Sequence, residues 1–388
     1  MSKNNKSMSN STKISRVGLK PSTNFGIPNP PVYHASTILY PKSESRRKRN
    51  VPYQYGRMGT PTSDVLSKAI AELYEAEGSI IAPSGLAAAV VGILSFVKSG
   101  DHFLVTDSAY GSTRKFITDF LPSINVEVEF YEPRIKSTEF ERLVRKNTSL
   151  IYFESPGSLT FELQDLPALT KVAKKYKITT ITDNTWGTAL GQNPFKLGID
   201  AVIESYTKYV SGHSDLVMGG VISNGKNLIK ILKQANIMGQ CTGPDDIYLA
   251  LRGLRTIKIR LEKSFSSSIE IAEWISKINM VTNVLHPATR FHPDHKIFKR
   301  DFNIGAGLFS FELDTRDTKI VDKFIDSLEL FGIGASWGGF ESLVLEADIN
   351  KIRNHKTYKN GTLIRLAIGM EDPKDLIEDL DQAFKKIN

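Results

Sequence analysis

Between residues 62 and 254, the hydrophobic positions of this chain follow two alternating patterns. Short apolar runs, rich in β-branched and aromatic residues, predict strands at 103–106, 126–131, 150–154, 178–182 and 201–205. Between them lie stretches with helical spacing of apolar residues, such as 62–73 and 166–176. This alternation predicts an α/β fold in which helices cover both faces of a parallel sheet.

The two ends of the chain differ from this central pattern. The opening residues are rich in Ser, Asn, Lys and Pro, which predicts an extended arm that can reach a neighbouring subunit. Beyond Leu254, a long amphipathic stretch is followed by a mixture of strands and helices, typical of a smaller α+β domain. We therefore predict three parts: an arm at 1–58, a main domain at 59–254 and a C-terminal domain at 255–388.

Composition places the chain among ordinary globular proteins. It has 388 residues, of which 40% are hydrophobic and 24% charged. No apolar run is long enough for a membrane span and the first 20 residues have no hydrophobic centre, so we expect neither membrane association nor secretion. Cys241 is the only cysteine, which excludes an internal disulfide and agrees with a cytoplasmic location.

The net charge of +8 and the cluster RRKR at 46–49 raise the possibility of an acidic partner. No nucleic-acid-binding motif accompanies the cluster, so we expect a solvated loop or an oligomer contact and no nucleic-acid partner. A non-enzymatic protein that binds polyanions through its basic arm is an alternative that the charge alone leaves open.

The segment ESYTKYVSGHSD at 204–215 indicates the chemistry most clearly, because it sets Lys208 among hydroxyls and glycines just after a predicted strand. A lysine there can form a Schiff base with pyridoxal 5′-phosphate (PLP), while Ser205 and Thr207 donate hydrogen bonds to the phosphate. Lys208 is therefore the candidate catalytic residue and covalent anchor.

Two further elements complete a PLP site. Asp183 ends a predicted strand, where its carboxylate can hold the proton on the pyridine nitrogen that makes the cofactor an electron sink. In the segment APSGLAAAVVGIL (82–94), a small-residue turn opens a predicted buried helix and exposes the backbone amides of Gly85 and Leu86, and helix starts of this kind bind phosphate.

Motifs along most of the chain resemble the Cys/Met-metabolism family of PLP enzymes, of fold type I, and within it the cystathionine β-lyase branch. The resemblance runs from about residue 23 to the end. Its motifs, in order, are YGRMGTPT (55–62), DSAYGSTR (107–114), ESPGS (154–158), DNTW (183–186), TKY (207–209), GHSD (212–215), ASWGGFES (335–342) and IRL (364–366).

The resemblance implies a mostly parallel seven-stranded sheet flanked by helices, a smaller α+β C-terminal domain and an N-terminal arm. It also implies a homotetramer of catalytic dimers, in which Tyr55 and Arg57 reach the cofactor phosphate of the neighbouring subunit and Tyr55 takes part in catalysis. Tyr110 should stack on the pyridine ring and assist catalysis.

On the substrate side, the resemblance implies that Arg365 clamps the α-carboxylate, which matches the fork of a guanidinium. Ser336 and Trp337 should line the same pocket.

Ser158 and Trp186 occupy positions where relatives that act at Cγ often carry other residues, so they favour the β-lyase branch. The expected activity is β-elimination of L-cystathionine to homocysteine, pyruvate and ammonia, in methionine biosynthesis. Alanine racemisation and a γ-lyase or γ-synthase reaction stay open as alternatives, because few pocket residues separate these activities.

Two other patterns carry less weight. His213, Ser214 and Asp215 are consecutive and cannot converge as a hydrolase triad. His286, His292 and His295 lie near prolines with no cysteine or carboxylate set around them, so we expect no metal site.

Overall fold

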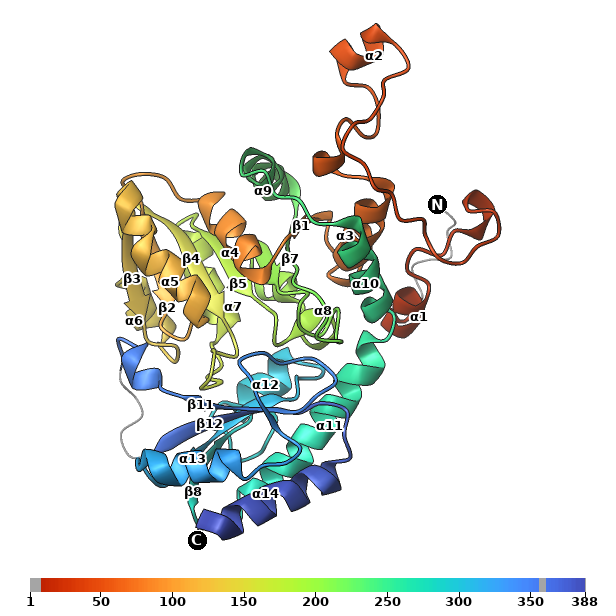
Figure 1. Ribbon diagram of the computed structural model, residues 1–388. Coiled ribbons are helices and arrows are strands. Elements are labelled where there is room, and N and C mark those ends of the chain that lie inside the picture. The colour runs from red at the N-terminus through yellow and green to blue at the C-terminus, as the bar shows by residue number, and fades with distance from the viewer. Residues whose placement is uncertain (1–7, 356–360, 388) are drawn as a thin grey trace.

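The computed structural model describes residues 8–355 and 361–387, and a seven-stranded sheet forms the centre of its larger half (Figure 1). In chain order its strands are Gly78–Ala82 (β1), His102–Thr106 (β2), Glu127–Tyr131 (β3), Thr148–Glu154 (β4), Thr179–Asp183 (β5), Ala201–Glu204 (β6) and Gly219–Ser223 (β7). The spatial order is β1-β7-β6-β5-β4-β2-β3. Only β7 runs antiparallel to its neighbours, so the predicted mostly parallel sheet is confirmed.

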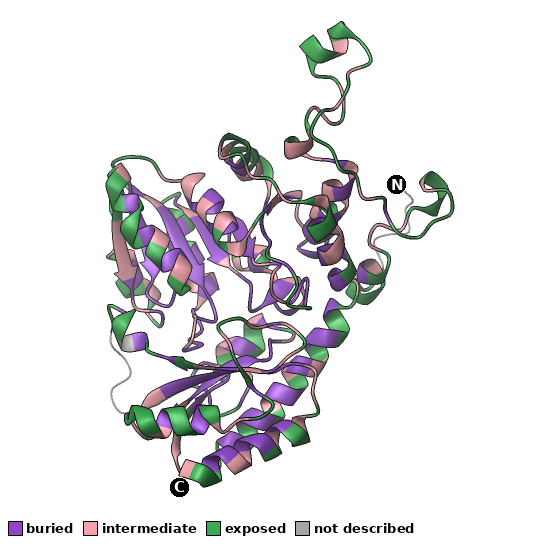
Figure 2. Cartoon of the chain, in the orientation of Figure 1, coloured by how far each residue is buried: buried purple, intermediate pink, exposed green. Residues whose placement is uncertain are grey.

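Helices cover both faces of this sheet. One face carries Pro61–Leu73 (α3), Ser137–Glu141 (α6), Leu166–Lys175 (α7) and Pro244–Leu254 (α10), and the other carries Gly85–Leu94 (α4), Gly111–Asp119 (α5) and Gly225–Ile237 (α9). Phe103 and Leu104 are neighbours on β2, yet they belong to different core clusters. The central strands are therefore buried on both faces (Figure 2), which explains the consecutive apolar residues of β2, β4 and β6.

A five-stranded sheet builds the smaller half. Its strands, in spatial order, are Gly332–Ile333 (β10), Leu343–Ala347 (β11), Thr362–Ala367 (β12), Leu308–Leu313 (β9) and Val281–Leu285 (β8). One face packs against Ile257–Ile275 (α11), Thr318–Asp326 (α13) and Pro373–Ile387 (α14). On the other side, Leu308 and Leu363 join the core cluster of the larger half. The domain boundaries after residues 58 and 254 stay predictions.

The remaining helices are short. Apart from α1 and α2 of the N-terminal arm, they are Thr188–Gly191 (α8) and His295–Asp301 (α12). Turns of 3-10 helix lie at Pro21–Thr23 (η2), Gly56–Met58 (η3), Leu121–Ile124 (η4), Pro194–Leu197 (η5) and Ile349–Lys351 (η6). No helix in the described part of the chain is long and apolar enough to cross a membrane.

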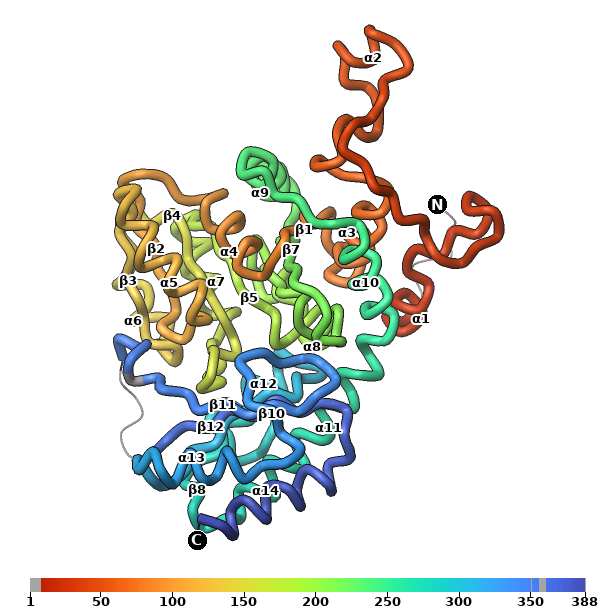
Figure 3. The backbone as a smooth tube through the Cα atoms, viewed as in Figure 1, coloured from red at the N-terminus to blue at the C-terminus, as the bar shows by residue number. Residues whose placement is uncertain are grey.

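The N-terminal arm consists of a packed and a projecting part. The helix Asn10–Ser15 (α1) lies against the larger half, where Ile14 is buried. Farther along, the arm leaves the body of the molecule and carries the helix Ser43–Lys48 (α2) at its far end (Figures 1 and 3). Phe25 and Leu39 are 99% and 87% exposed, an unusual position for large apolar side chains.

Candidate active site

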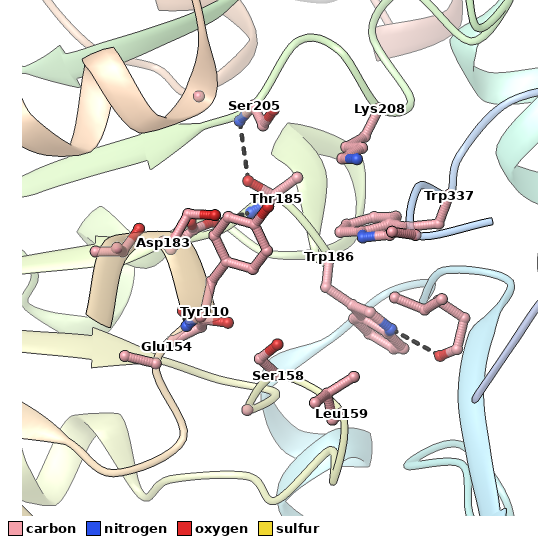
Figure 4. Close-up of a pocket in the computed structure, with 18 of the residues that line it drawn as sticks. Tyr110, Glu154, Ser158, Leu159, Asp183, Thr185, Trp186, Ser205, Lys208 and Trp337 are labelled. Atoms are coloured by element: carbon pink, nitrogen blue, oxygen red, sulfur yellow. Dashed lines mark hydrogen bonds between the residues drawn. The ribbon is translucent and has the colours of Figure 1, made fainter. Parts of the chain in front are cut away.

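A cavity of about 410 Å³ lies where the two halves meet, at the carboxyl ends of strands of the larger sheet. Figure 4 shows the side chains that line it. Those from the larger half include Gly85, Tyr110, Glu154, Asp183, Ser205 and Lys208, and those from the smaller half include Trp337 and Arg365. The fold thus brings most of the residues selected from the sequence into one cavity.

Lys208 follows β6 in a turn and is partly buried. Its Nζ donates a hydrogen bond to Ser336 Oγ at 2.9 Å and lies 5.4 Å from the centre of the Trp337 ring. Burial, followed by the nearby positive charge of Arg365, lowers the pKa of Lys208 to about 8. Lys208 therefore has a larger neutral fraction near pH 7 than an ordinary lysine, as a nucleophilic amine requires.

Asp183 ends β5, and its Oδ1 accepts a hydrogen bond from the Thr185 backbone N–H at 2.8 Å. Burial raises the pKa of Asp183, while the Thr185 hydrogen bonds and Lys208 oppose the rise. A carboxylate in such a site gains stability from a cationic partner. Asp183 is therefore suited to face a protonated ring nitrogen.

The start of α4 lines the same cavity. Ser84 caps the helix by accepting a hydrogen bond from the Ala87 N–H at 2.9 Å, and Gly85 and Leu86 form its first turn. A Cβ on Gly85 would lie 2.6 Å from Ser205 Oγ, so a larger residue would displace Ser205. The first-turn amides of a helix have no partner within it, which suits this end of the cavity to a phosphate.

Thr207 also lines the cavity, but its hydroxyl forms hydrogen bonds within the chain. Its Oγ1 donates to the Met218 carbonyl at 3.0 Å and accepts from the Met218 N–H at 2.9 Å. The donation of Thr207 to a phosphate stays a prediction, because the hydroxyl hydrogen already has an acceptor. Ser205 is held by its N–H, which donates to Thr185 Oγ1 at 2.9 Å.

Tyr110 immediately precedes α5, lines the cavity and is 47% exposed as a residue. Its backbone N–H donates to Glu154 Oε2 at 2.8 Å. Burial, and then the nearby Asp183, raises the pKa of Glu154 well above its ordinary value. The sequence alone indicates no role for Glu154, because only the parallel pairing of β4 with β5 places it opposite Asp183.

Arg365 on β12 is the substrate-side residue with the strongest geometric support. Its guanidinium donates to the carbonyls of Gly334 at 2.9 Å and Ser336 at 3.0 Å. Its buried Nε has no hydrogen-bond partner among the described residues. Burial lowers the pKa of Arg365 to about 10. A carboxylate in the cavity would satisfy a donor that the chain itself leaves unused.

The two residues that favoured one branch of the family both line the cavity. Trp186 is fixed by a hydrogen bond from its Nε1 to the Leu308 carbonyl at 3.0 Å, and Ser158 lies in the turn after β4. In Figure 4, Ser158 and Leu159 border the pocket on the side away from Lys208. These residues belong to the walls of the cavity.

Tyr55 and Arg57 do not line the cavity of their own chain. Tyr55 lies at the base of the projecting arm, next to η3, and the Arg57 guanidinium donates to the Asn236 carbonyl at 3.1 Å. Their predicted role in a neighbouring subunit stays a prediction.

The residues of the cavity fit PLP. Lys208, with its lowered pKa, can react with the aldehyde, and the buried Asp183 carboxylate can face the ring nitrogen. The start of α4, where Gly85 leaves space beside Ser205, can bind the phosphate. In the described ranges, no group of three or more His, Cys, Asp or Glu residues is arranged to hold a metal ion.

Comparison with known proteins agrees with this chemistry. The sequence profile of the family described as Cys/Met metabolism PLP-dependent enzyme matches residues 11–385. A putative cystathionine beta-lyase of Rhizobium johnstonii is 43% identical over 96% of this chain and 95% of its own length. An L-alanine/L-glutamate racemase of Wolbachia pipientis is 38% identical over 96% of each chain.

Among solved structures, the cystathionine gamma synthase of Xanthomonas oryzae pv. oryzae, in complex with aminoacrylate and cysteine, matches with a TM-score of 0.90 and 28% identity. The match covers 98% of both chains. The relatives therefore agree on the family and differ in the reaction that their names give.

Proposed function

The chain belongs to the Cys/Met-metabolism family of PLP-dependent enzymes, and from this premise we propose that it cleaves L-cystathionine by β-elimination in methionine biosynthesis. It is a PLP-dependent carbon–sulfur lyase, so the alternative of a non-enzymatic polyanion-binding protein is not retained. The main support for the specific reaction is the cavity itself, because Lys208, Ser158 and Trp186 all line it.

Bound PLP supplies an electron sink that stabilises negative charge at the substrate Cα. The chain supplies the remaining functions. Arg365 binds the α-carboxylate, using the Nε that has no other acceptor. When PLP is bound, Asp183 would hold the positive charge of the ring nitrogen, and the amides of Gly85 and Leu86 would bind the phosphate with Ser205 and Thr207. Tyr110 orients the ring by stacking.

Lys208 carries the proton through the reaction. With PLP bound, the Lys208 Nζ would remove the Cα proton and then deliver a proton to the sulfur as the Cβ–S bond breaks. Homocysteine leaves as the thiol, and hydrolysis of the remaining three-carbon enamine consumes one water and yields pyruvate and ammonia. Ser336, which accepts a hydrogen bond from Nζ at 2.9 Å, can hold the amine between these steps.

We further propose a cytoplasmic homotetramer of catalytic dimers. The projecting arm supports this assembly, because its exposed apolar residues would be buried by contact with another subunit. Tyr55 and Arg57 lie at the base of the arm, where they could take part in that contact. The single free cysteine, Cys241, agrees with a reducing compartment.

Racemisation of alanine, or of a similar amino acid, is the second candidate. It has support from the Wolbachia relative, whose name gives L-alanine and L-glutamate as substrates. Both reactions begin with removal of the Cα proton. In racemisation a proton then returns to Cα from the opposite face, whereas in β-elimination the Cβ–S bond of the substrate breaks. A γ-lyase or γ-synthase reaction has support from the Xanthomonas structure.

One incubation distinguishes these candidates. Purified enzyme with L-cystathionine should release pyruvate and homocysteine, whereas γ-cleavage would release 2-oxobutyrate and cysteine. A parallel chiral assay with L-alanine and L-glutamate measures racemisation. Absence of pyruvate, together with either alternative product, would reject the β-elimination proposal.

A further inference from the structure

The turn that follows β4 is held in an unfavourable backbone conformation beside the cavity. Leu159 and Phe161 have φ angles of 69° and 57°, in the left-handed region that bulky side chains rarely adopt. Such a conformation persists only when the surrounding structure enforces it, and it is concentrated at functional sites. Because Leu159 lines the cavity, the contacts that enforce the turn also determine the shape of the pocket.

Arg353 provides these contacts from the smaller half. Its Nη2 donates to the Ser158 carbonyl at 2.9 Å and to Thr160 Oγ1 at 2.5 Å, and its Nη1 lies 3.8 Å from Glu162 Oε1. Thr160 Oγ1 in turn donates to Glu162 Oε2. Arg353, Thr160 and Glu162 are 8%, 0% and 2% exposed. We call these three buried residues the Arg353 clamp.

The Arg353 clamp connects two walls of the cavity. Arg353 follows η6, and the apolar side chains of Ile349 and Ile352 line the cavity from that segment. Leu159 lines it from the turn after β4. A guanidinium can donate in several directions within one plane, so a single side chain fixes the turn relative to the η6 segment.

The residues after Arg353 are fixed as well. The Asn354 and His355 N–H groups donate to the two carboxylate oxygens of Asp107 at 3.1 and 2.7 Å, and Arg114 pairs with the same carboxylate at 2.8 Å. The segment that follows η6 is therefore attached to the larger half through three consecutive residues, Arg353, Asn354 and His355.

We propose that Arg353 is a specificity-determining positioning residue. By holding Leu159 against the wall formed by Ile349 and Ile352, it shapes the part of the cavity that receives the substrate side chain beyond Cβ. This inference rests on the proposed function. Leu159, Ile349 and Ile352 make this wall apolar, and the charge of Arg353 is already paired with Glu162. The wall therefore favours the methylenes and sulfur of a thioether amino acid over a compact substrate.

The test compares two substrates that share β-elimination but differ in length. L-Cystathionine fills the pocket beyond Cβ, whereas β-chloro-L-alanine carries only a small leaving group, and both release pyruvate. In Arg353→Met, kcat/KM for L-cystathionine should fall about 30-fold, mainly through KM, as expected for the loss of charged hydrogen bonds. The value for β-chloro-L-alanine should change by less than about threefold.

Two further variants complete the design. Thr160→Val removes one acceptor of the Arg353 clamp at nearly constant volume. It should lower the substrate ratio, kcat/KM for L-cystathionine divided by kcat/KM for β-chloro-L-alanine, and so it tests the proposal even if Arg353→Met does not fold. Arg134→Met is the matched control, because Arg134 Nε donates to both oxygens of Asp294 at 3.0 and 2.9 Å, outside the cavity. It should leave the substrate ratio unchanged.

Equal losses for the two substrates in both Arg353→Met and Thr160→Val would overturn the proposal. Failure of the proposed function is a separate result, seen when the wild-type enzyme forms no pyruvate from L-cystathionine. In that case the inference is tested by binding instead of turnover. The affinities of wild type and of the two variants for L-norleucine and for glycine are measured from the change in cofactor absorbance. Loss of affinity for L-norleucine alone supports it, and equal changes overturn it.

Discussion

Replacement of Glu204 by Gln should make the stability of this protein less dependent on pH. Glu204 ends β6 and is buried, with its Oε2 accepting a hydrogen bond from the Tyr74 hydroxyl at 2.7 Å. The same hydroxyl accepts a hydrogen bond from Asn184 Nδ2 at 3.1 Å, and Asn184 follows Asp183. This chain of contacts supports the strand end that presents Asp183 to the cavity.

Burial is the main cause that raises the pKa of Glu204 from 4.5 to about 8, and the charge of Asp183 adds to the rise. A raised pKa means that the folded protein binds the proton more tightly than the unfolded chain. This stabilisation is fully present below pH 4.5 and is lost as the pH rises through about 8. From 1.4 kcal/mol for each unit of pKa, the loss between pH 5 and pH 9 is ~4 kcal/mol as an upper value.

The glutamine variant keeps an acceptor for Tyr74 but cannot ionise. Denaturant unfolding of the holoenzyme at several pH values, at fixed protein and PLP concentrations, measures the effect. The free energy of unfolding of Glu204→Gln, relative to that of wild type, should increase by up to ~4 kcal/mol between pH 5 and pH 9. Comparing the two pH values removes any cost of the amide that does not depend on pH.

The exposed Glu346 on β11 offers a control, since its replacement by Gln is a surface substitution and should change stability by no more than ~0.5 kcal/mol. Parallel stability curves for Glu204→Gln and wild type from pH 5 to pH 9 would refute the reasoning, because they would show that Glu204 is not a buried neutral acid.

Three further predictions concern the cavity. Asp183→Asn should lower kcat for L-cystathionine by at least about 100-fold with a smaller change in KM, because a neutral amide cannot hold the ring proton; an unchanged kcat in steady-state assays would contradict this role. Arg365→Lys should raise KM about 10-fold to 100-fold, since lysine lacks the guanidinium fork, and an unaltered KM would exclude the carboxylate role. If sites are shared between chains, refolding Arg57→Ala and Lys208→Ala subunits together should restore about a quarter of the wild-type activity, because half of the dimers are mixed and each of these has one intact site. No recovery of activity would indicate that each chain contains a complete site.

The sheet could be predicted where burial leaves a clear pattern. Strands β2, β4, β5 and β6 are buried along most of their length, so their runs of apolar and β-branched residues are distinct in the sequence, and Asp183 follows directly from the end of one of them. Strands β1 and β7 were not predicted. Each begins with glycine, and β7 inserts antiparallel between β1 and β6, a pairing that depends on tertiary contacts.

The candidate site divides in a similar way. Lys208, Asp183 and Gly85 were accessible from sequence, because their chemistry is tied to a strand end or a helix start. Glu154 and Arg353 were not assigned, since their roles depend on strand pairing and on contact between the two halves. The hydrogen bonds of Thr207 with Met218 were equally invisible, because they join residues across a loop.

The central claim is that Lys208 is the residue covalently linked to PLP. Borohydride reduction of the purified enzyme, followed by proteolysis and peptide mass spectrometry, locates the link directly. We predict a phosphopyridoxyl group on the peptide that contains Lys208, and loss of the visible cofactor absorbance in Lys208→Ala. A modified peptide elsewhere in the chain, with Lys208 unmodified, would contradict the account.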